Sequence, residues 1–130
     1  MNAQGYHRQI VALIASISAI SSSSVTFREI DENECYVKAV LTFATGHELP
    51  LAEYVILRAE NVERPKYRYQ LLSVDKKPLA RWDNAPHHSQ IASFPYHRHD
   101  ARERVYPSRE MSPADAIAES LTLIDQLSSQ

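Results

Sequence analysis

Histidine, the side chain best suited to moving protons near neutral pH, is concentrated in one short part of this sequence. Four of the six histidines fall between positions 87 and 99, namely His87, His88, His97 and His99. They lie in two runs, RWDNAPHH at 81–88 and FPYHRH at 94–99, which also carry arginine and aromatic residues. An imidazole titrates at about pH 6.5, so one ring can accept a proton while another donates one. We therefore expect the chemistry of this protein to lie in these two runs.

This set of residues matches what metal-free cleavage of RNA requires. RNA carries its own nucleophile, the 2′-hydroxyl, so a protein must supply a proton acceptor, a proton donor and a cation beside the phosphate. Arginine can bind two phosphate oxygens at once and stays charged, and aromatic rings stack on unpaired bases. Around the histidines, the candidates for these two roles are Arg68, Arg81, Arg98, Tyr67, Tyr69 and Trp82. The pattern favours RNA as a substrate.

Two other interpretations of the histidines stay open. His97 and His99 share one face if the segment is extended, and imidazole and carboxylate ligands from His87, His88 and Asp83 could complete a zinc, nickel or iron site. The helical metal-binding spacings HxxxH and HExxH are missing from the sequence, so we predict no metal and no other cofactor. Alternatively, the tetrapeptide DNAP is typical of a turn capped by its own side chains, and the histidines would then be polar surface.

Length and composition bound the class of protein. A chain of 130 residues suits one domain, and 44% hydrophobic with 23% charged residues excludes a fully disordered chain. Two glycines exclude a glycine-rich phosphate loop, and the single Cys35 excludes a disulfide framework and a cysteine-based zinc site. The net charge is −2, yet residues 58–104 carry ten Lys and Arg against six Asp and Glu. The central segment can therefore present a basic face.

Hydrophobic periodicity predicts a single α+β domain over residues 1–130. Apolar residues spaced three or four apart predict a helix at 6–20, and the four serines at its end predict a break in the chain. Alternation of apolar and polar residues, interrupted by short turns, predicts an antiparallel meander of about five strands within 25–83. The sheet and the first helix together supply the main apolar surface of the domain.

The C-terminal part of the chain has a different character. Residues 84–111 show no period and predict a long, histidine-rich loop, which is usually functional in a compact domain. Ser112 followed by Pro113 is typical of a helix start, and an apolar stripe extends the predicted helix over 113–128. We expect the N-terminal and C-terminal helices to flank the sheet and cover one of its faces, leaving the other face or the rim for the loop.

The apolar run at 10–20 is too short to cross a bilayer, which takes about 20 residues. Its surroundings are a poor match to a secretory signal and its spacing suits a core helix. A single thiol suits a reducing compartment. We therefore predict a cytoplasmic protein with no membrane partner.

The two histidine runs, followed by VYPSREMSPADAIAESL at 105–121, resemble the TumE-type toxin family of bacterial toxin–antitoxin modules. The resemblance covers about residues 66–125, and the YRY strand resembles the Y-x-Y strand of that family. It implies a small cytoplasmic toxin that a co-encoded antitoxin, often a small DNA-binding protein, neutralises. It also implies RNA cleavage, by analogy with other small toxins. The positions that match the family pattern are Tyr67, Tyr69, Arg81, Asp83, Asn84, His87, His88, His97 and His99.

Three positions depart from the family pattern. Trp82 stands in place of a tyrosine, which keeps a stacking face but loses a hydroxyl group. Tyr96 stands in place of a histidine, which indicates that this position is dispensable or that this member is altered. Arg98 stands in place of a lysine and retains the charge.

From residues and resemblance together, we predict a toxin that is a metal-independent endoribonuclease. His87 or His88 would form an acid–base pair with His97 or His99. Arg81 and Arg98 would bind the phosphate, and Asp83 would orient an imidazole or cap the turn. The remaining substrate-binding candidates are Tyr67, Arg68, Tyr69, Trp82 and Asn84.

The expected partners are the antitoxin, an RNA substrate and, through the apolar faces of the terminal helices, a second copy in a homodimer. Two alternatives remain, a non-catalytic interaction protein and a histidine–metal enzyme. Burial of the imidazoles against backbone partners would favour the first, and stoichiometric metal in the purified protein the second.

Overall fold

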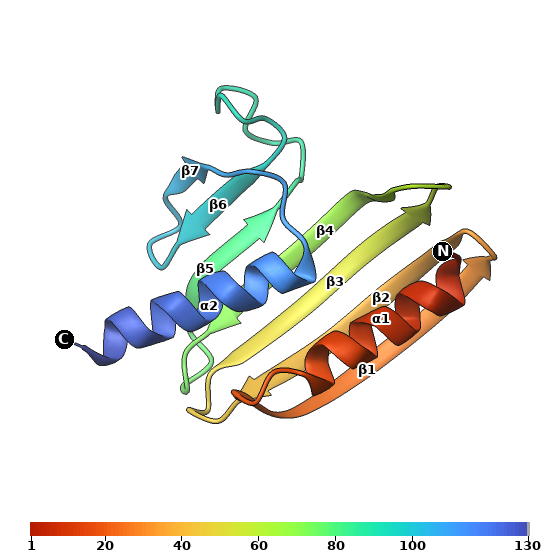
Figure 1. Cartoon of the computed structure of the whole chain (residues 1–130). Coiled ribbons are helices and arrows are strands. Elements are labelled where there is room, and N and C mark those ends of the chain that lie inside the picture. The colour runs from red at the N-terminus through yellow and green to blue at the C-terminus, as the bar shows by residue number, and fades with distance from the viewer. Residues whose placement is uncertain (130) are drawn as a thin grey trace.

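The computed structural model describes residues 1–129 and contains one antiparallel sheet with two helices (Figure 1). The sheet has seven strands in sequence order, each paired with the next. Both helices lie on the same face of the sheet (Figure 1), so its other face, here called the open face, carries no helix. The elements in chain order are α1 Ala3–Ala15, β1 Ile20–Asp31, β2 Glu34–Phe43, β3 Glu48–Leu57, β4 Val62–Leu72, β5 Pro78–Asp83, β6 His97–Asp100, β7 Val105–Pro107 and α2 Pro113–Ser128.

The core lies between the helices and the sheet. Strands β2 and β3 alternate strictly between buried and more exposed positions, and their buried residues pack against α1 and α2. Helix α1 presents Tyr6, Ile10 and Ile14 to this core. Helix α2 presents Ala116, Ile117 and Ile124. The α+β class and the meander predicted from period two are confirmed.

A buried polar network crosses this core. The carboxylate of Glu53 on β3 accepts hydrogen bonds from the hydroxyl groups of Tyr6 and Tyr69. Arg64 on β4 donates from Nε to Glu53 Oε2 at 3.0 Å and from Nη2 to the Tyr6 hydroxyl at 3.1 Å. The carboxylate is therefore held by three partners, which is the usual condition for a buried charge in a protein.

The boundaries of two predicted elements are wrong. Helix α1 begins three residues earlier than predicted, because Asn2 caps it by accepting from Gly5 N. It ends at Ala15 rather than at residue 20, and β1 starts at Ile20, so the four serines belong to a strand and not to a break. Pairing with β2 extends back to Ile20, opposite Phe43, and this pairing outweighs the helical spacing of the apolar residues.

The strand count of about five is also wrong, because the predicted loop 84–111 contains β6 and β7. These strands have four and three residues, which is too short for alternation to be visible in a sequence. Helix α2 matches its prediction, since Ser112 and Asp115 form a reciprocal capping box and Pro113 occupies its first turn. Among residues 1–129, no helix is both long and apolar enough to span a membrane.

The thiol of Cys35 gives a simple test of this core. Cys35 is fully buried, and burial, with the charge of Glu53 second, raises its pKa to about 11. At about pH 8 the group is both covered and protonated, so we expect a thiol reagent to modify the folded protein roughly 100-fold more slowly than the protein unfolded in guanidinium. With a reagent that releases a chromophore when it reacts with a thiol, the time course of absorbance measures both rates. Rapid modification of the folded protein would contradict this packing.

Candidate active site

Strand pairing places four of the predicted site residues together. In the β5–β6 ladder Asp83 lies opposite His97 and Arg81 lies opposite His99. Directly opposed residues, and residues two apart on one strand, point to the same face of a sheet. These four side chains therefore share the open face, and the imidazole centroids of His97 and His99 are 4.9 Å apart.

A third imidazole comes from the segment that joins β5 to β6. The ring of His88 lies 4.9 Å from that of His97 and 5.6 Å from that of His99, measured between centroids. One ligand nitrogen from each ring falls within 4.8 Å of the others. We call His88, His97 and His99 the histidine cluster. Among residues 1–129, these three histidines form the group whose donor atoms lie close enough together to share one metal ion.

His87 does not belong to this cluster. Its side chain is exposed, and it directly precedes His88, whose ring contacts the other two histidines. An acid–base role at the cluster is therefore not available to His87 in this structure.

The carboxylate of Asp83 connects the cluster to the backbone. Oδ1 lies 2.8 Å from Nε2 of His97 and accepts a hydrogen bond from Ala85 N at 3.0 Å. Oδ2 accepts from Nε of Arg81 at 3.0 Å. Asp83 therefore caps the turn after β5, and the same oxygen faces the ring of His97.

His97 and His99 are buried but differ in their partners. His97 is 2% exposed, and its Nδ1 lies 3.0 Å from the carbonyl oxygen of Pro95. His99 is 6% exposed, and neither of its ring nitrogens has a hydrogen-bond partner among residues 1–129. Its nearest anionic groups are Glu103 Oε2, 3.4 Å from Nδ1, and Asp83 Oδ2, 3.8 Å from Nε2.

The surroundings of His99 also change its acidity. Burial, followed by the positive charge of Arg81, lowers the pKa of His99, against the smaller opposing effect of Asp83. The neutral ring is therefore the favoured form at neutral pH, and it carries one nitrogen with a free electron pair.

The arginines predicted to share one phosphate are separated by the sheet. Arg98 lies opposite Trp82 in the ladder, so it points to the helix-covered side, where its guanidinium stacks on Tyr106 at 4.7 Å from the ring centroid. Arg81 lies on the open face and is 20% exposed. The prediction that Arg81 and Arg98 bind one phosphate together is wrong. Arg98 pairs with Trp82, the neighbour of Arg81 on β5, and successive residues of a strand point to opposite faces of the sheet.

The predicted base-stacking rings also point into the core. Tyr67, Tyr69 and Trp82 are at most 2% exposed, since their strand positions face the helices. Asn84 serves the backbone, with Oδ1 accepting from Tyr67 N at 2.9 Å and Nδ2 donating to the carbonyl oxygens of Arg64 and Pro65. These four side chains therefore stabilise the fold around the cluster and do not present a surface to a base.

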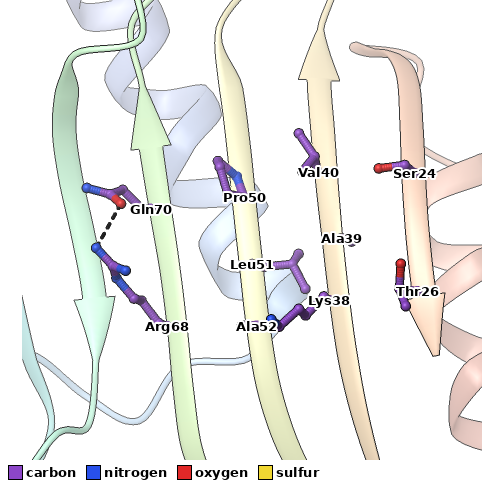
Figure 2. Close-up of a pocket in the computed structure, with 10 residues that line it drawn as sticks. All are labelled: Ser24, Thr26, Lys38, Ala39, Val40, Pro50, Leu51, Ala52, Arg68 and Gln70. Atoms are coloured by element: carbon purple, nitrogen blue, oxygen red, sulfur yellow. Dashed lines mark hydrogen bonds between the residues drawn. The ribbon is translucent and has the colours of Figure 1, made fainter. Parts of the chain in front are cut away.

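Several residues that the sequence interpretation missed lie on the open face. Arg68, the one substrate-binding candidate found there, is exposed and pairs in register with Asp83. Figure 2 shows Arg68 among the residues that line a hollow, here called the open-face groove. The open-face groove has a volume of about 270 Å³ and is lined by Ser24, Thr26, Lys38, Ala39, Val40, Pro50, Leu51, Ala52, Arg68 and Gln70.

A second hollow of about 230 Å³ continues the open-face groove, because the two share Lys38, Ala52 and Arg68. It adds Lys66 and the rings of Tyr36 and Tyr54, which stack with centroids 4.9 Å apart. The signal for these residues was present in the sequence, since Tyr36 and Lys38 occupy the polar phase of the alternation in β2. Glu103 was missed because it reaches His99 through the turn after β6, where it adopts a positive φ of 60°.

Comparison with known proteins agrees with the resemblance noted in the sequence. The model of a protein family described as Toxin TumE matches residues 10–128, which is nearly the whole chain. No curated protein and no solved structure gives a significant match.

Proposed function

Because the chain belongs to the TumE toxin family, we propose that it is the toxin of a toxin–antitoxin module and that it cleaves RNA at the histidine cluster. One observation carries the proposal. Three imidazoles, one from the segment between β5 and β6 and two from β6, meet Arg81 and Asp83 on the open face. Such a gathering of proton-transfer groups beside a guanidinium is the arrangement expected at a site of phosphate chemistry.

The reaction that suits this site is the internal transesterification of RNA. The 2′-oxygen attacks the phosphorus, the bond from phosphorus to the 5′-oxygen breaks, and the products carry a 2′,3′-cyclic phosphate and a 5′-hydroxyl group. The 2′-hydroxyl loses its proton and the 5′-oxygen gains one, so no water or co-reactant is consumed. Arg81 would balance the added negative charge on the phosphate oxygens.

The open face supports RNA as the substrate. The open-face groove and its continuation carry Lys38, Lys66 and Arg68, and cations attract the phosphate backbone. Tyr36 lies between the guanidinium of Arg28, 4.7 Å from its centroid, and the ring of Tyr54, so this row adds an exposed aromatic edge beside the cations. Arg68 joins this surface to the cluster through its register with Asp83. We propose that single-stranded RNA lies across β2–β4 and reaches the cluster at β5.

The metal-independent acid–base pair predicted from the sequence fits this site only in part. His97 and His99 are buried, so contact with a substrate falls to the half-buried His88 and to Arg81. The proposed function therefore keeps RNA cleavage and the position of the site, but it does not keep His97 or His99 as the partner in an acid–base pair that touches the substrate.

The test uses one pair of neighbouring histidines. The purified full-length protein is incubated with a single-stranded RNA and with DNA of the same sequence. We expect RNA fragments that end in 2′,3′-cyclic phosphate and intact DNA, because DNA has no 2′-hydroxyl. His88→Ala should lower the cleavage rate at least about tenfold, whereas His87→Ala, which changes an exposed ring outside the cluster, should keep it. Equal activity of the two variants would show that the histidine cluster takes no part in the reaction.

A non-catalytic toxin is the alternative, and the burial of His97 and His99 favours it. In that case the protein would arrest growth by binding a target, and the imidazoles would only stabilise the loop. Growth arrest that persists in the His88→Ala variant, together with intact RNA in the cleavage assay, would support this alternative.

The identity of the antitoxin, a cytoplasmic location and a homodimer stay predictions. Family membership supports a cognate antitoxin. We expect the protein encoded beside this chain to co-purify with it and to bind DNA.

A further inference from the structure

We propose that His88, His97 and His99, together with Asp83, bind a divalent first-row transition metal ion, with Zn²⁺ as the reference ion. This inference differs from the sequence prediction of no metal. It goes beyond the proposed function and does not depend on RNA cleavage, because a metal ion in this position could hold the loop before β6 as well as take part in a reaction.

The first argument is the spacing of the donor atoms. Ligand nitrogens of the three histidines lie within 4.8 Å of one another. The centre of a triangle of that size is about 2.8 Å from each corner, and a Zn–N bond is about 2.1 Å. Each ring would therefore close by about 0.7 Å, a shift that a change of side-chain torsion supplies. The carboxylate of Asp83 lies outside this group of three donor atoms, but its Oδ1 is 2.8 Å from Nε2 of His97, so it would have to move in to become the fourth ligand of a tetrahedral zinc ion.

The second argument is the contact between His97 and Asp83. Nδ1 of His97 faces the carbonyl oxygen of Pro95 at 3.0 Å, so this nitrogen must carry the proton and donate it. The lone pair of Nε2 then points at Oδ1 of Asp83 from 2.8 Å. Two lone pairs at this distance repel each other unless a cation, either a second proton or a metal ion, lies beside both.

The third argument is His99. It is more than nine-tenths buried, and its two ring nitrogens lack hydrogen-bond partners among the described residues 1–129. A buried polar atom without a partner costs free energy, and coordination of a metal by Nε2 would remove that cost. Nδ1 faces Glu103 Oε2 at 3.4 Å, so it could then donate its proton to this carboxylate. Carboxylate–histidine–metal arrangements of this kind orient the ligand ring.

The local charge also permits a divalent cation. Asp83 and Glu103 contribute two negative charges, and Arg81 contributes one positive charge. The guanidinium of Arg81 bonds Oδ2 of Asp83, so Oδ1, which faces His97, keeps an electron pair for the ion. Arg81 and Ala85 thereby fix the orientation of the carboxylate from outside the ligand set.

The test is a metal titration of the full-length protein without an affinity tag, because a histidine tag would bind the same ions. The protein is stripped with chelator and titrated with Zn²⁺ in competition with a chromophoric chelator. We expect one equivalent to bind. Co²⁺ should give the intense visible absorption of a tetrahedral site. His99→Ala should weaken Zn²⁺ binding by about 100-fold or more, and the exposed His87→Ala should change it less than about twofold.

A second variant shows whether weaker binding arises from misfolding of the protein. His88→Ala alters a half-buried ring in the connecting segment, so it should leave the unfolding transition in place while it weakens Zn²⁺ binding at least about tenfold. Substoichiometric binding by the native sequence, or equal weakening by His87→Ala and His88→Ala, would overturn the inference.

The outcome is separable from that of the proposed function, because the titration contains no RNA. Zinc binding with no RNA cleavage would leave this inference standing and remove the proposed function. Cleavage of RNA by the stripped protein, together with no zinc binding, would do the reverse.

Discussion

Arg64→Met is expected to lower the free energy of unfolding by about 3–5 kcal/mol. Arg64 is 15% exposed and donates to Glu53, whose side chain is 0% exposed. The hydroxyl groups of Tyr6 and Tyr69 also donate to this carboxylate, but they carry no charge. Without the guanidinium, a buried anion would keep only neutral partners, and desolvation of that anion would no longer be offset.

A second ion pair of the same chemical type provides the control. Arg58 donates to Glu63 at 3.1 Å, but these side chains are 60% and 42% exposed. Exposed pairs contribute about 0–1 kcal/mol, so Arg58→Met should cost no more than that. Denaturant unfolding of the variants measures both losses. Similar losses for Arg58→Met and Arg64→Met would show that burial of Glu53 does not set the energy of the network.

The same network allows a sharper test. Glu53→Gln in combination with Arg64→Met removes both charges and keeps hydrogen-bonding groups near the two tyrosines. We expect the double variant to be more stable than Arg64→Met alone, because no unpaired carboxylate is left in the core. A double variant that is less stable than Arg64→Met would indicate that packing of the arginine side chain, and not its charge, is lost.

Arg81→Met is expected to reduce RNA cleavage by about 100- to 1000-fold, the usual effect of removing one donor that stabilises transition-state charge. Arg81 lies on the open face beside His99 and Asp83. Arg98→Met should change the rate by less than about threefold, because Arg98 points to the other side of the sheet and stacks on Tyr106. The sequence analysis predicts that both arginines bind the phosphate, whereas the structure places only Arg81 of the two on the open face. The comparison of the two variants therefore distinguishes between these expectations.

Two further measurements make the Arg81 result interpretable. The unfolding transition of Arg81→Met shows whether the loss of its bond to Asp83 has disturbed the fold. Arg81→Lys keeps the charge but cannot form the two-point contact with a phosphate, so we expect an intermediate rate. If Arg98→Met loses as much activity as Arg81→Met, the reaction does not take place on the open face.

Much of the fold could be predicted from the sequence, because local rules govern it. Alternation in β2 and β3 sorts buried from exposed positions, and the Ser112–Pro113 start defines α2. The predictions are wrong where a distant pairing outweighs a local preference. The serines after α1 become part of β1 because β2 pairs with them, and β6 and β7 form because β5 offers an edge to a segment with no period of its own.

The same distinction between local pattern and distant pairing applies to the candidate site. The sequence by itself determined which residue types were available, since four histidines and their flanking arginines occur in one segment. Only the tertiary structure decided that His88, His97 and His99 meet, that His87 stays outside, and that Arg98 and the rings of Tyr67, Tyr69 and Trp82 face away. The physical reason is that strand register sets the face on which each side chain lies, and β6, with four residues, is too short for its own hydrophobic pattern to specify that register.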